Sequence, residues 1–291
     1  MRTLGGVAAA CVGTLALGGG TASARVVGDG TARSCTSAAV VAAVRAGGHP
    51  PQVTLSGGGK RRILYMNTCD PAQKFTTSHC QDQATPRLTV KDIAFERGNA
   101  TGERFDGGGG GAIFARGGRL RILRSTFTGN RCDSEGPDLG GGAVRVLSQY
   151  HGRAVDVTSS RFTRNVCSNG GALSSIAVSW NIVRSRFTGN RAIGRGANPA
   201  HAGTPGGGSG GAIYNDGNRV ALKLTNCRLW ENRAREGGGA IFFVSNDRTG
   251  TLAIARSRLG HNPSQGFETR NLPGIFYLGA GKPAITDSVL R

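Results

Sequence analysis

The sequence lacks several features that would assign it to a common class of protein. No apolar run reaches the roughly 20 residues that a membrane-spanning helix needs. Its 49 glycines cluster instead of recurring at every third residue, which excludes collagen. Acidic residues are few: 17 Asp and Glu stand against 36 Lys and Arg, for a net charge of +19. Aromatic residues are only 6% of the chain, but the hydrophobic share of 38% is enough for a folded core.

The positive charge comes almost entirely from arginine, because only 5 of the basic residues are lysine. A charge of this size and sign favours anionic partners, namely acidic glycans, phosphate polymers or nucleic acid.

The N-terminal segment has the order of a secretory signal peptide. A basic residue precedes an apolar stretch from Leu4 to Leu17, and small residues then lead to an A-x-A pattern at Ala22–Ala24. Residues 1–24 are therefore predicted to be removed on export, which leaves Arg25 as the first mature residue. A short buried helix is the structural alternative, and the surroundings of Cys11 loosely resemble a lipoprotein site.

Export would place the six remaining cysteines in an oxidising compartment. None of them shows the C-x-x-C spacing of a metal site and histidine is scarce, so we expect neither a metal nor a cofactor. The polar segment between Cys69 and Cys80 is best explained as a loop whose ends are joined by a disulfide between these two cysteines. Cys227 is predicted to be a buried free thiol, and Cys35 has no obvious partner.

Two interleaved motifs recur along the chain with a shared period of about 30 residues. The first is a six-residue segment that ends in Phe or Leu and, in five copies, is followed by x-x-Asn. The second is Gly-Gly-Ala followed by an aliphatic residue. The six-residue segments are 90–95, 122–127, 157–162, 182–187, 224–229, 254–259 and 285–290, and the asparagines are Asn130, Asn165, Asn190, Asn232 and Asn262.

This period predicts a solenoid of strands, because the segments are short, β-branched and interrupted by glycine. A strand, a corner that exposes Arg124, a second strand, a turn and the Gly-Gly-Ala strand would form one coil of a three-sided parallel β-helix. Coils stack at about 4.8 Å, so equal positions form ladders. The asparagines should form a buried ladder whose side-chain amides bond to the next coil, and the glycine pairs should turn corners with positive φ.

The predicted fold class is therefore all-β, a right-handed parallel β-helix with a short N-terminal capping helix. Residues 53–291 form the repeat domain and residues 25–52 its N-terminal cap, with the helix over 35–47. Cys132 and Cys167 both lie two places after a ladder asparagine in consecutive coils. Ladder neighbours are close enough for a disulfide, so we predict one between them.

The repeats also resemble those of a known family. GGGGAIF at 108–114 and GSGGAIY at 208–214, alternating with FTGN, FTRN and LWEN, are similar to the GGA(I/V)/FxxN repeats of polymorphic outer-membrane proteins. The resemblance covers roughly residues 86–290. It implies the right-handed parallel β-helix of the pectin lyase-like superfamily and secretion or surface display, and we expect a freely secreted protein similar to the passenger part of those proteins.

One face of the Gly-Gly-Ala sheet is the predicted binding site. If the aliphatic residue of each copy points inward, the next residue points outward, which aligns Phe114, Arg145, Ser174, Tyr214 and Phe242. Aromatic rings beside arginine suit stacking on sugars and recognition of carboxylate or phosphate. We therefore predict substrate binding by Phe114, Arg145, Tyr214 and Phe242. The alternatives are that loops cover this face and that the long loop 192–207 is the interacting element.

The residues for catalysis are less well defined. A β-helix lyase needs a base, an acid and a group that neutralises a uronate, and Tyr150, His151 and Asp216 are the available candidates. No two carboxylates recur at matching ladder positions, so neither a calcium cluster nor a glycosidase pair is evident.

We therefore expect a secreted protein that binds an anionic polysaccharide or cell-envelope polymer. A polysaccharide lyase or glycoside hydrolase is the alternative, which rests on analogy of fold alone. Nucleic acid is the partner that we least expect for an exported solenoid.

Overall fold

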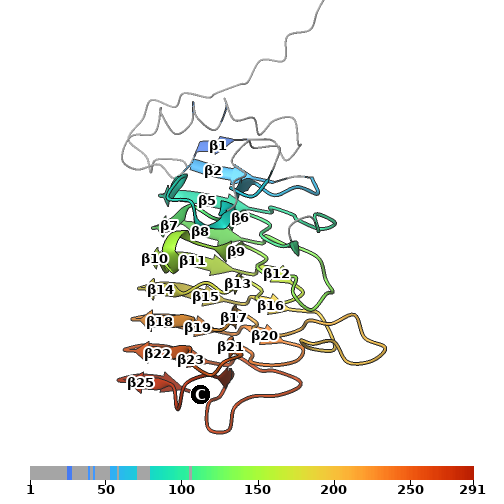
Figure 1. Ribbon diagram of the computed structural model, residues 1–291, viewed down its shortest axis with the longest axis vertical. Coiled ribbons are helices and arrows are strands. Elements are labelled where there is room, and N and C mark those ends of the chain that lie inside the picture. Colours follow the sequence, from blue (N-terminus) through green and yellow to red (C-terminus); the bar gives the residue numbers. More distant parts are fainter. Residues whose placement is uncertain are drawn as a thin grey trace, which may run out of the picture.

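The computed structural model describes residues 25–27, 39, 42, 53–57, 59–70, 79–104 and 107–291. In this part of the chain, strands stack coil upon coil along the long axis, from the N-terminal strands at the top of Figure 1 to the C-terminal strands at the bottom. All pairs of named strands are parallel and form four sheets. The prediction of an all-β parallel β-helix is confirmed.

Sheet A contains the second strand of each six-residue segment, sheet C the first strand and sheet B the Gly-Gly-Ala strand, while sheet D is a short addition at the asparagine turn. Sheet A has the order β1 (Arg25–Val27), β2 (Val53–Ser56), β5 (Ile93–Glu96), β8 (Thr126–Thr128), β11 (Arg161–Thr163), β15 (Arg186–Thr188), β19 (Arg228–Trp230), β23 (Arg258–Gly260) and β26 (Val289–Leu290). Sheet D has the order β12 (Val166–Cys167), β16 (Arg191–Ala192) and β20 (Arg233–Ala234).

The other two sheets have seven strands each, and two 3-10 turns lie beside them. Sheet C comprises β4 (Arg87–Lys91), β7 (Arg119–Leu123), β10 (Val155–Thr158), β14 (Trp180–Val183), β18 (Ala221–Thr225), β22 (Thr251–Ala255) and β25 (Ala284–Thr286). Sheet B comprises β3 (Leu64–Asn67), β6 (Ile113–Arg116), β9 (Val144–Ser148), β13 (Leu173–Ile176), β17 (Ile213–Gly217), β21 (Ile241–Ser245) and β24 (Ile275–Leu278). The 3-10 turns are η2 (Cys80–Asp82) and η4 (Tyr150–Gly152).

A sharp corner divides each six-residue segment into its two strands. The third residue of the segment has a left-handed backbone, with φ of 44° at Arg124, 48° at Arg184 and 49° at Arg256. This corner turns the chain from sheet C into sheet A, and all three arginines are exposed as predicted for Arg124.

The core is built from in-register stacks of identical side chains. The rings of Phe95, Phe127, Phe162 and Phe187 are fully buried and stack with centroid distances of 4.9, 4.7 and 4.7 Å. Leu229 and Leu259 continue the stack in the following coils. Burying a side chain of this kind stabilises the fold by about 1.5–3 kcal/mol, so each added coil extends one continuous core.

The asparagines stack in a buried turn. Asn165 Oδ1 accepts the backbone N–H of Asn130 at 3.0 Å and its side-chain N–H at 2.9 Å, while Asn165 Nδ2 donates to the carbonyl of Phe127 at 3.0 Å. The pattern repeats through Asn190, Asn232 and Asn262. Each amide therefore bonds to polar groups of the preceding coil, and its Nδ2 also donates to the asparagine of the next coil, at 2.9 Å from Asn165 to Asn190.

A serine ladder runs beside the corner. Ser125 donates its hydroxyl to the carbonyl of Leu123 at 2.9 Å and accepts the backbone N–H of Ile93 at 3.3 Å. Cys227 takes the serine position in its coil, where its thiol contacts the carbonyls of Ile182 and Thr225 at 3.4 Å. It is a buried free thiol as predicted, and burial raises its pKa.

The two glycines of each Gly-Gly-Ala copy serve different purposes. The first has positive φ, for example 74° at Gly141 and 70° at Gly210, which favours glycine. The second does not, so the expectation that both turn the corner is wrong. A Cβ at the second glycine, such as Gly171, would collide with the carbonyl of the equivalent glycine in the next coil, Gly211.

Both predicted cysteine pairs lie at disulfide distance. The Cα atoms of Cys69 and Cys80 are 4.9 Å apart and those of Cys132 and Cys167 are 4.8 Å apart. The second pair lies in a column of small residues, because Cys167 is in register with Ala192. Two adjacent coils are thereby joined at the start of the loops over sheet B.

Most of the N-terminal region lies outside the described residues, including Cys35 and residues 1–24, for which a signal peptide is predicted. The predicted capping helix over 35–47 also lies outside them, except for Ala39 and Ala42, which are both helical. Ala39 packs against the core. Within the predicted cap of 25–52, β1 adds a strand to sheet A by pairing with β2.

We predict that Asn165→Ala is more destabilising than Arg164→Ala. The first change removes a buried amide and leaves Asn130 and Phe127 with unsatisfied groups, which costs about 1–3 kcal/mol. Arg164 is exposed in a left-handed turn that also accepts glycine at 129 and 189, so its loss should change the free energy of unfolding by less than about 0.5 kcal/mol. Urea unfolding measures the free energy of unfolding of both variants. Equal stabilities would contradict the role of the asparagine ladder.

Candidate functional site

The predicted binding row points away from the main core. Ile113 and its equivalents in the other strands of sheet B belong to the core, whereas the following residues form a separate layer outside it. In that layer the rings of Tyr214 and Phe242 stack at 4.9 Å, and Phe114 stacks on Tyr65 at 5.5 Å. The inferred alternation of side chains along the strand therefore agrees with the structure.

The row is nevertheless not open to solvent. Exposed fractions are 0% at Phe114, 1% at Arg145, 0% at Ser174 and Tyr214, and 3% at Phe242. The structure therefore agrees with the alternative that this face is covered, and the four predicted binding residues do not form an open surface. A polymer could stack on these rings only after the loops had moved.

Two loops, 133–140 and 192–207, cover the row at Arg145 and Tyr214 and are bonded to each other, whereas the Arg62 guanidinium lies over Phe114 and the Phe267 ring contacts Phe242. The backbone N–H of Gly136 donates to the carbonyl of Gly206 at 3.0 Å. The side-chain amide of Asn198 donates to Asp138 Oδ1 at 2.8 Å and to the Tyr214 hydroxyl at 2.6 Å. The loop 192–207, drawn in yellow at the right of Figure 1, is therefore partly a structural cover over sheet B.

Arg145 is the most unusual member of the row, because it is a fully buried arginine. Its guanidinium donates to Ser174 Oγ at 2.5 Å and to the carbonyl of Asp138, and among the described residues its Nε has no hydrogen-bond partner. Burial lowers the pKa of Arg145 to about 10, while the nearby Tyr214, Asp138 and Asp216 act in the opposite direction. The residue stays charged at neutral pH and holds loop 133–140 against sheet B.

A chain of polar contacts leads from this buried region to the end of β17. The Tyr214 hydroxyl donates to Asp216 Oδ2 at 3.2 Å, and the Asn246 amide donates to Asp216 Oδ1 at 3.2 Å. Burial raises the pKa of Asp216, partly offset by these two hydrogen bonds. Burial also raises the pKa of Tyr214, so the phenol remains protonated at neutral pH.

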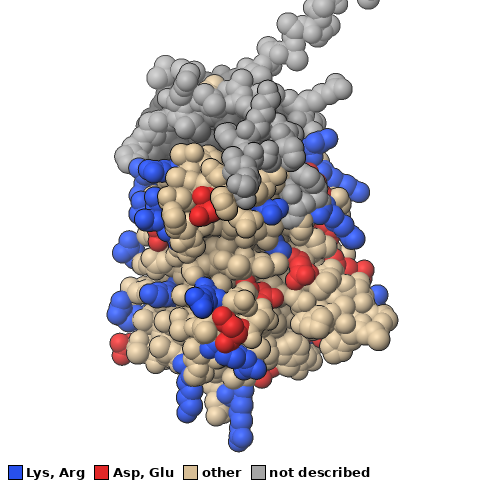
Figure 2. Space-filling model, in the orientation of Figure 1, with Lys and Arg blue, Asp and Glu red and all other residues tan. Residues whose placement is uncertain are grey.

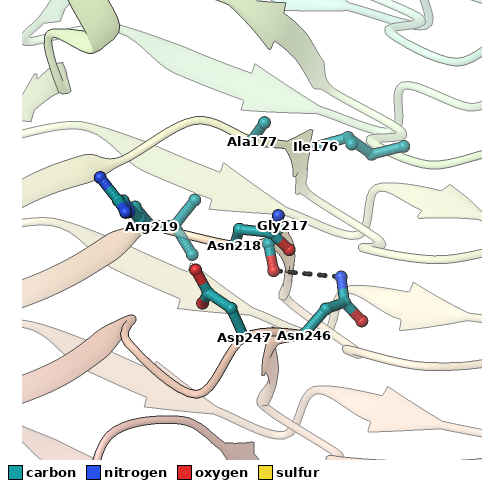
Figure 3. A pocket seen from close by; sticks show the side chains of 8 residues that line it. Ile176, Ala177, Gly217, Asn218, Arg219, Asn246 and Asp247 are labelled. Carbon is teal, nitrogen blue, oxygen red and sulfur yellow. Dashed lines mark hydrogen bonds between the residues drawn. The ribbon is translucent and has the colours of Figure 1, made fainter.

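An open cavity of about 600 Å³ lies beside this chain, at the corner between sheets B and C. Figure 3 shows Asn246 and Asp247 rising from the turn after β21 toward the turn at 217–220, with Ile176 and Ala177 in the preceding coil. Asn246 donates to the carbonyl of Gly217 at 3.1 Å. The cavity combines an apolar wall with polar rim residues, a combination found in small-molecule sites.

The residues considered for catalysis are not brought together. Tyr150 and His151 lie on η4, after β9, whereas Asp216 lies on β17 with β13 between them. The backbone N–H of His151 donates to Asp82 Oδ1 at 2.5 Å, which fastens η4 to η2. These three residues therefore do not form an acid–base site. Among the described residues, no group of three or more His, Cys, Asp and Glu could hold a metal ion.

The residues with the clearest functional geometry form an exposed arginine ladder on sheet A. Arg161, Arg186, Arg228 and Arg258 are in register on four consecutive strands, and all four are exposed. Within the described part of the chain, none of them forms an ion pair. Sequence reasoning missed this ladder, although its signal is the arginine before the final Phe or Leu in four successive repeats.

Positive charge is spread along the solenoid beyond this ladder. Arg191 and Arg233 are exposed and in register on sheet D. Figure 2 shows Lys and Arg spaced along the left margin of the molecule, beside the strands labelled β10, β14, β18 and β22 in Figure 1, with fewer Asp and Glu in view.

Comparison with known proteins gives one relevant match. The model of the Chlamydia polymorphic membrane protein repeat matches residues 184–216, which extend from the corner after β14 to β17. The match covers a single repeat and agrees with the resemblance found in the sequence. No curated protein and no solved structure matched. In the described residues, no helix has the length and apolar character needed to cross a bilayer.

The raised pKa of Asp216 predicts a pH-dependent stability. The carboxyl group binds its proton more tightly in the folded than in the unfolded chain, so the free energy of unfolding should fall as pH rises from 3.8 through the folded-state pKa. Asp216→Asn should remove that fall. Urea unfolding over a pH series tests this, with Asp247→Asn as the control.

Asp247 has the opposite shift, because hydrogen bonds from Thr249 lower its pKa. Its contribution to stability is present above the ordinary pKa and is lost on acidification through the folded-state pKa, so the control should change the pH profile in the other direction. Parent and Asp216→Asn profiles that run parallel would contradict the assignment.

Proposed function

We propose that this protein is exported and binds an anionic polysaccharide of a cell envelope without cleaving it. The observation that carries the proposal is the arginine ladder of sheet A, four exposed cations in register with no acidic partner in the described residues. The net charge of +19 strengthens the attraction for polyanions at low salt. The proposed site is therefore on sheet A and not at the covered row on sheet B.

Export and surface association are supported by two further features. The A-x-A pattern puts the first mature residue at Arg25, which is also the first residue of β1, so cleavage there would leave every named strand intact. The match to a Chlamydia polymorphic membrane protein repeat supports a surface-associated protein with the β-helix of the pectin lyase-like superfamily.

A lyase or hydrolase is the weaker proposal. Tyr150 and His151 are separated from Asp216 by a strand, and Tyr214 and Arg145 lie beneath the covering loops. No observation on these residues favours bond cleavage over binding.

Binding to immobilised polysaccharides tests the proposal. The exported protein should bind acidic polysaccharides such as alginate and polygalacturonate, should bind neutral dextran much more weakly, and should dissociate as salt is added. Absorbance of unsaturated products in the same samples detects lyase activity. Equal binding to acidic and neutral polymers, or no binding to either, would refute the proposed function, and formation of unsaturated products would replace it with the lyase.

A further inference from the structure

The arginine ladder has a fixed spacing. Each of its residues is followed by a core residue, and the core rings of Phe127, Phe162 and Phe187 are 4.7 Å apart from coil to coil. Because the strands are in register, the ladder positions repeat with the same rise along the solenoid axis. The cations thus form a row along the axis, perpendicular to the strands.

Such a row works against stability. Like charges directly opposite each other on neighbouring strands are destabilising. The fold does not require arginine at this position, because Thr126 occupies it in β8, in register with Arg161. Four successive arginines therefore point to a role outside folding.

Neighbouring side chains prepare the same face for a ligand. Thr163, Thr188 and Trp230 occupy the position two residues after a ladder arginine, on the same side of sheet A. The guanidinium of Arg228 lies 4.5 Å from the centroid of the Trp230 ring, a cation–π contact that restrains it. The threonine hydroxyls can donate and accept hydrogen bonds, as sugar hydroxyls require.

From this arrangement we propose that the ladder binds a linear polysaccharide with a carboxylate on every sugar, laid along the solenoid axis with one sugar per coil. The inference rests on the proposed function and names the ligand class. A guanidinium takes a carboxylate through two parallel hydrogen bonds, and one pyranose extends a chain by nearly the coil rise. A polymer with a carboxylate on every second sugar reaches only every second arginine.

Titration calorimetry with defined oligomers tests the inference. The probes are alginate oligomers, which carry a carboxylate on every sugar, and hyaluronan oligomers of equal length, which carry one on every second sugar. Alginate should bind about tenfold or more tightly than hyaluronan, since a hyaluronan tetramer offers the ladder two carboxylates where an alginate tetramer offers four. Affinity should rise with alginate length up to the tetramer and then level off.

The test variant carries both Arg161→Thr and Arg186→Thr. Threonine is the residue found at the equivalent position of β8, Thr126. The melting temperature of this variant should be equal to or above that of the parent, and its affinity for alginate should fall about tenfold or more. The control is Arg153→Thr with Arg270→Thr, two exposed residues outside the ladder, which removes the same charge. The control should keep most of the affinity.

Each other outcome has a definite meaning. Equal affinities for alginate and hyaluronan would overturn the spacing claim and leave the proposed function standing. Unchanged alginate binding by the folded ladder variant would move the site off sheet A. Failure of the parent to bind any acidic polysaccharide would remove the proposed function itself. Tighter binding of a single-stranded oligonucleotide or of phosphatidylglycerol vesicles would overturn the choice of ligand class.

Discussion

The rise of one coil, set by parallel backbone hydrogen bonds, is the constraint on which the rest of the molecule depends. Any residue that recurs at the same place in the repeat is stacked at this distance, whatever its chemistry. For Phe127 and Phe162 the result is ring stacking, and for Asn130 and Asn165 it is a chain of amide hydrogen bonds. For Arg161 and Arg186 it is a row of like charges. The first two stabilise the fold, whereas the third is destabilising unless anions neutralise it.

The covered face of sheet B shows what the repeat does not control. The loops at 133–140 and 192–207 are inserted within repeats, between the asparagine turn and the Gly-Gly-Ala strand. Their contacts bring together groups with no common period, such as Asn198 with Tyr214 and Gly136 with Gly206. They cover Arg145 and Tyr214, which would otherwise be exposed. Sheet B is therefore a covered face, whereas sheet A is itself the surface at the arginine ladder.

The sequence alone was sufficient for the features that obey the period. Cys132 and Cys167 follow the ladder asparagines at the same offset, and the inward alternation at Ile113 follows from the pleat. The sequence left open whether Phe114 and Tyr214 are exposed or covered, because their burial depends on long-range contacts that leave no recurring pattern. The second glycine of each pair was misread because its requirement, close approach to Gly211 in the case of Gly171, lies between coils.

The central claim is that a polyanion lies along the arginine ladder, and paramagnetic broadening by a ligand tests it most directly. A nitroxide at the reducing end of an alginate tetramer should broaden backbone amide signals at one end of the series β11, β15, β19 and β23, with an effect that declines steadily along the series. Signals of the loops 133–140 and 192–207 should be broadened least. Broadening centred on the loops 133–140 and 192–207 would contradict the account.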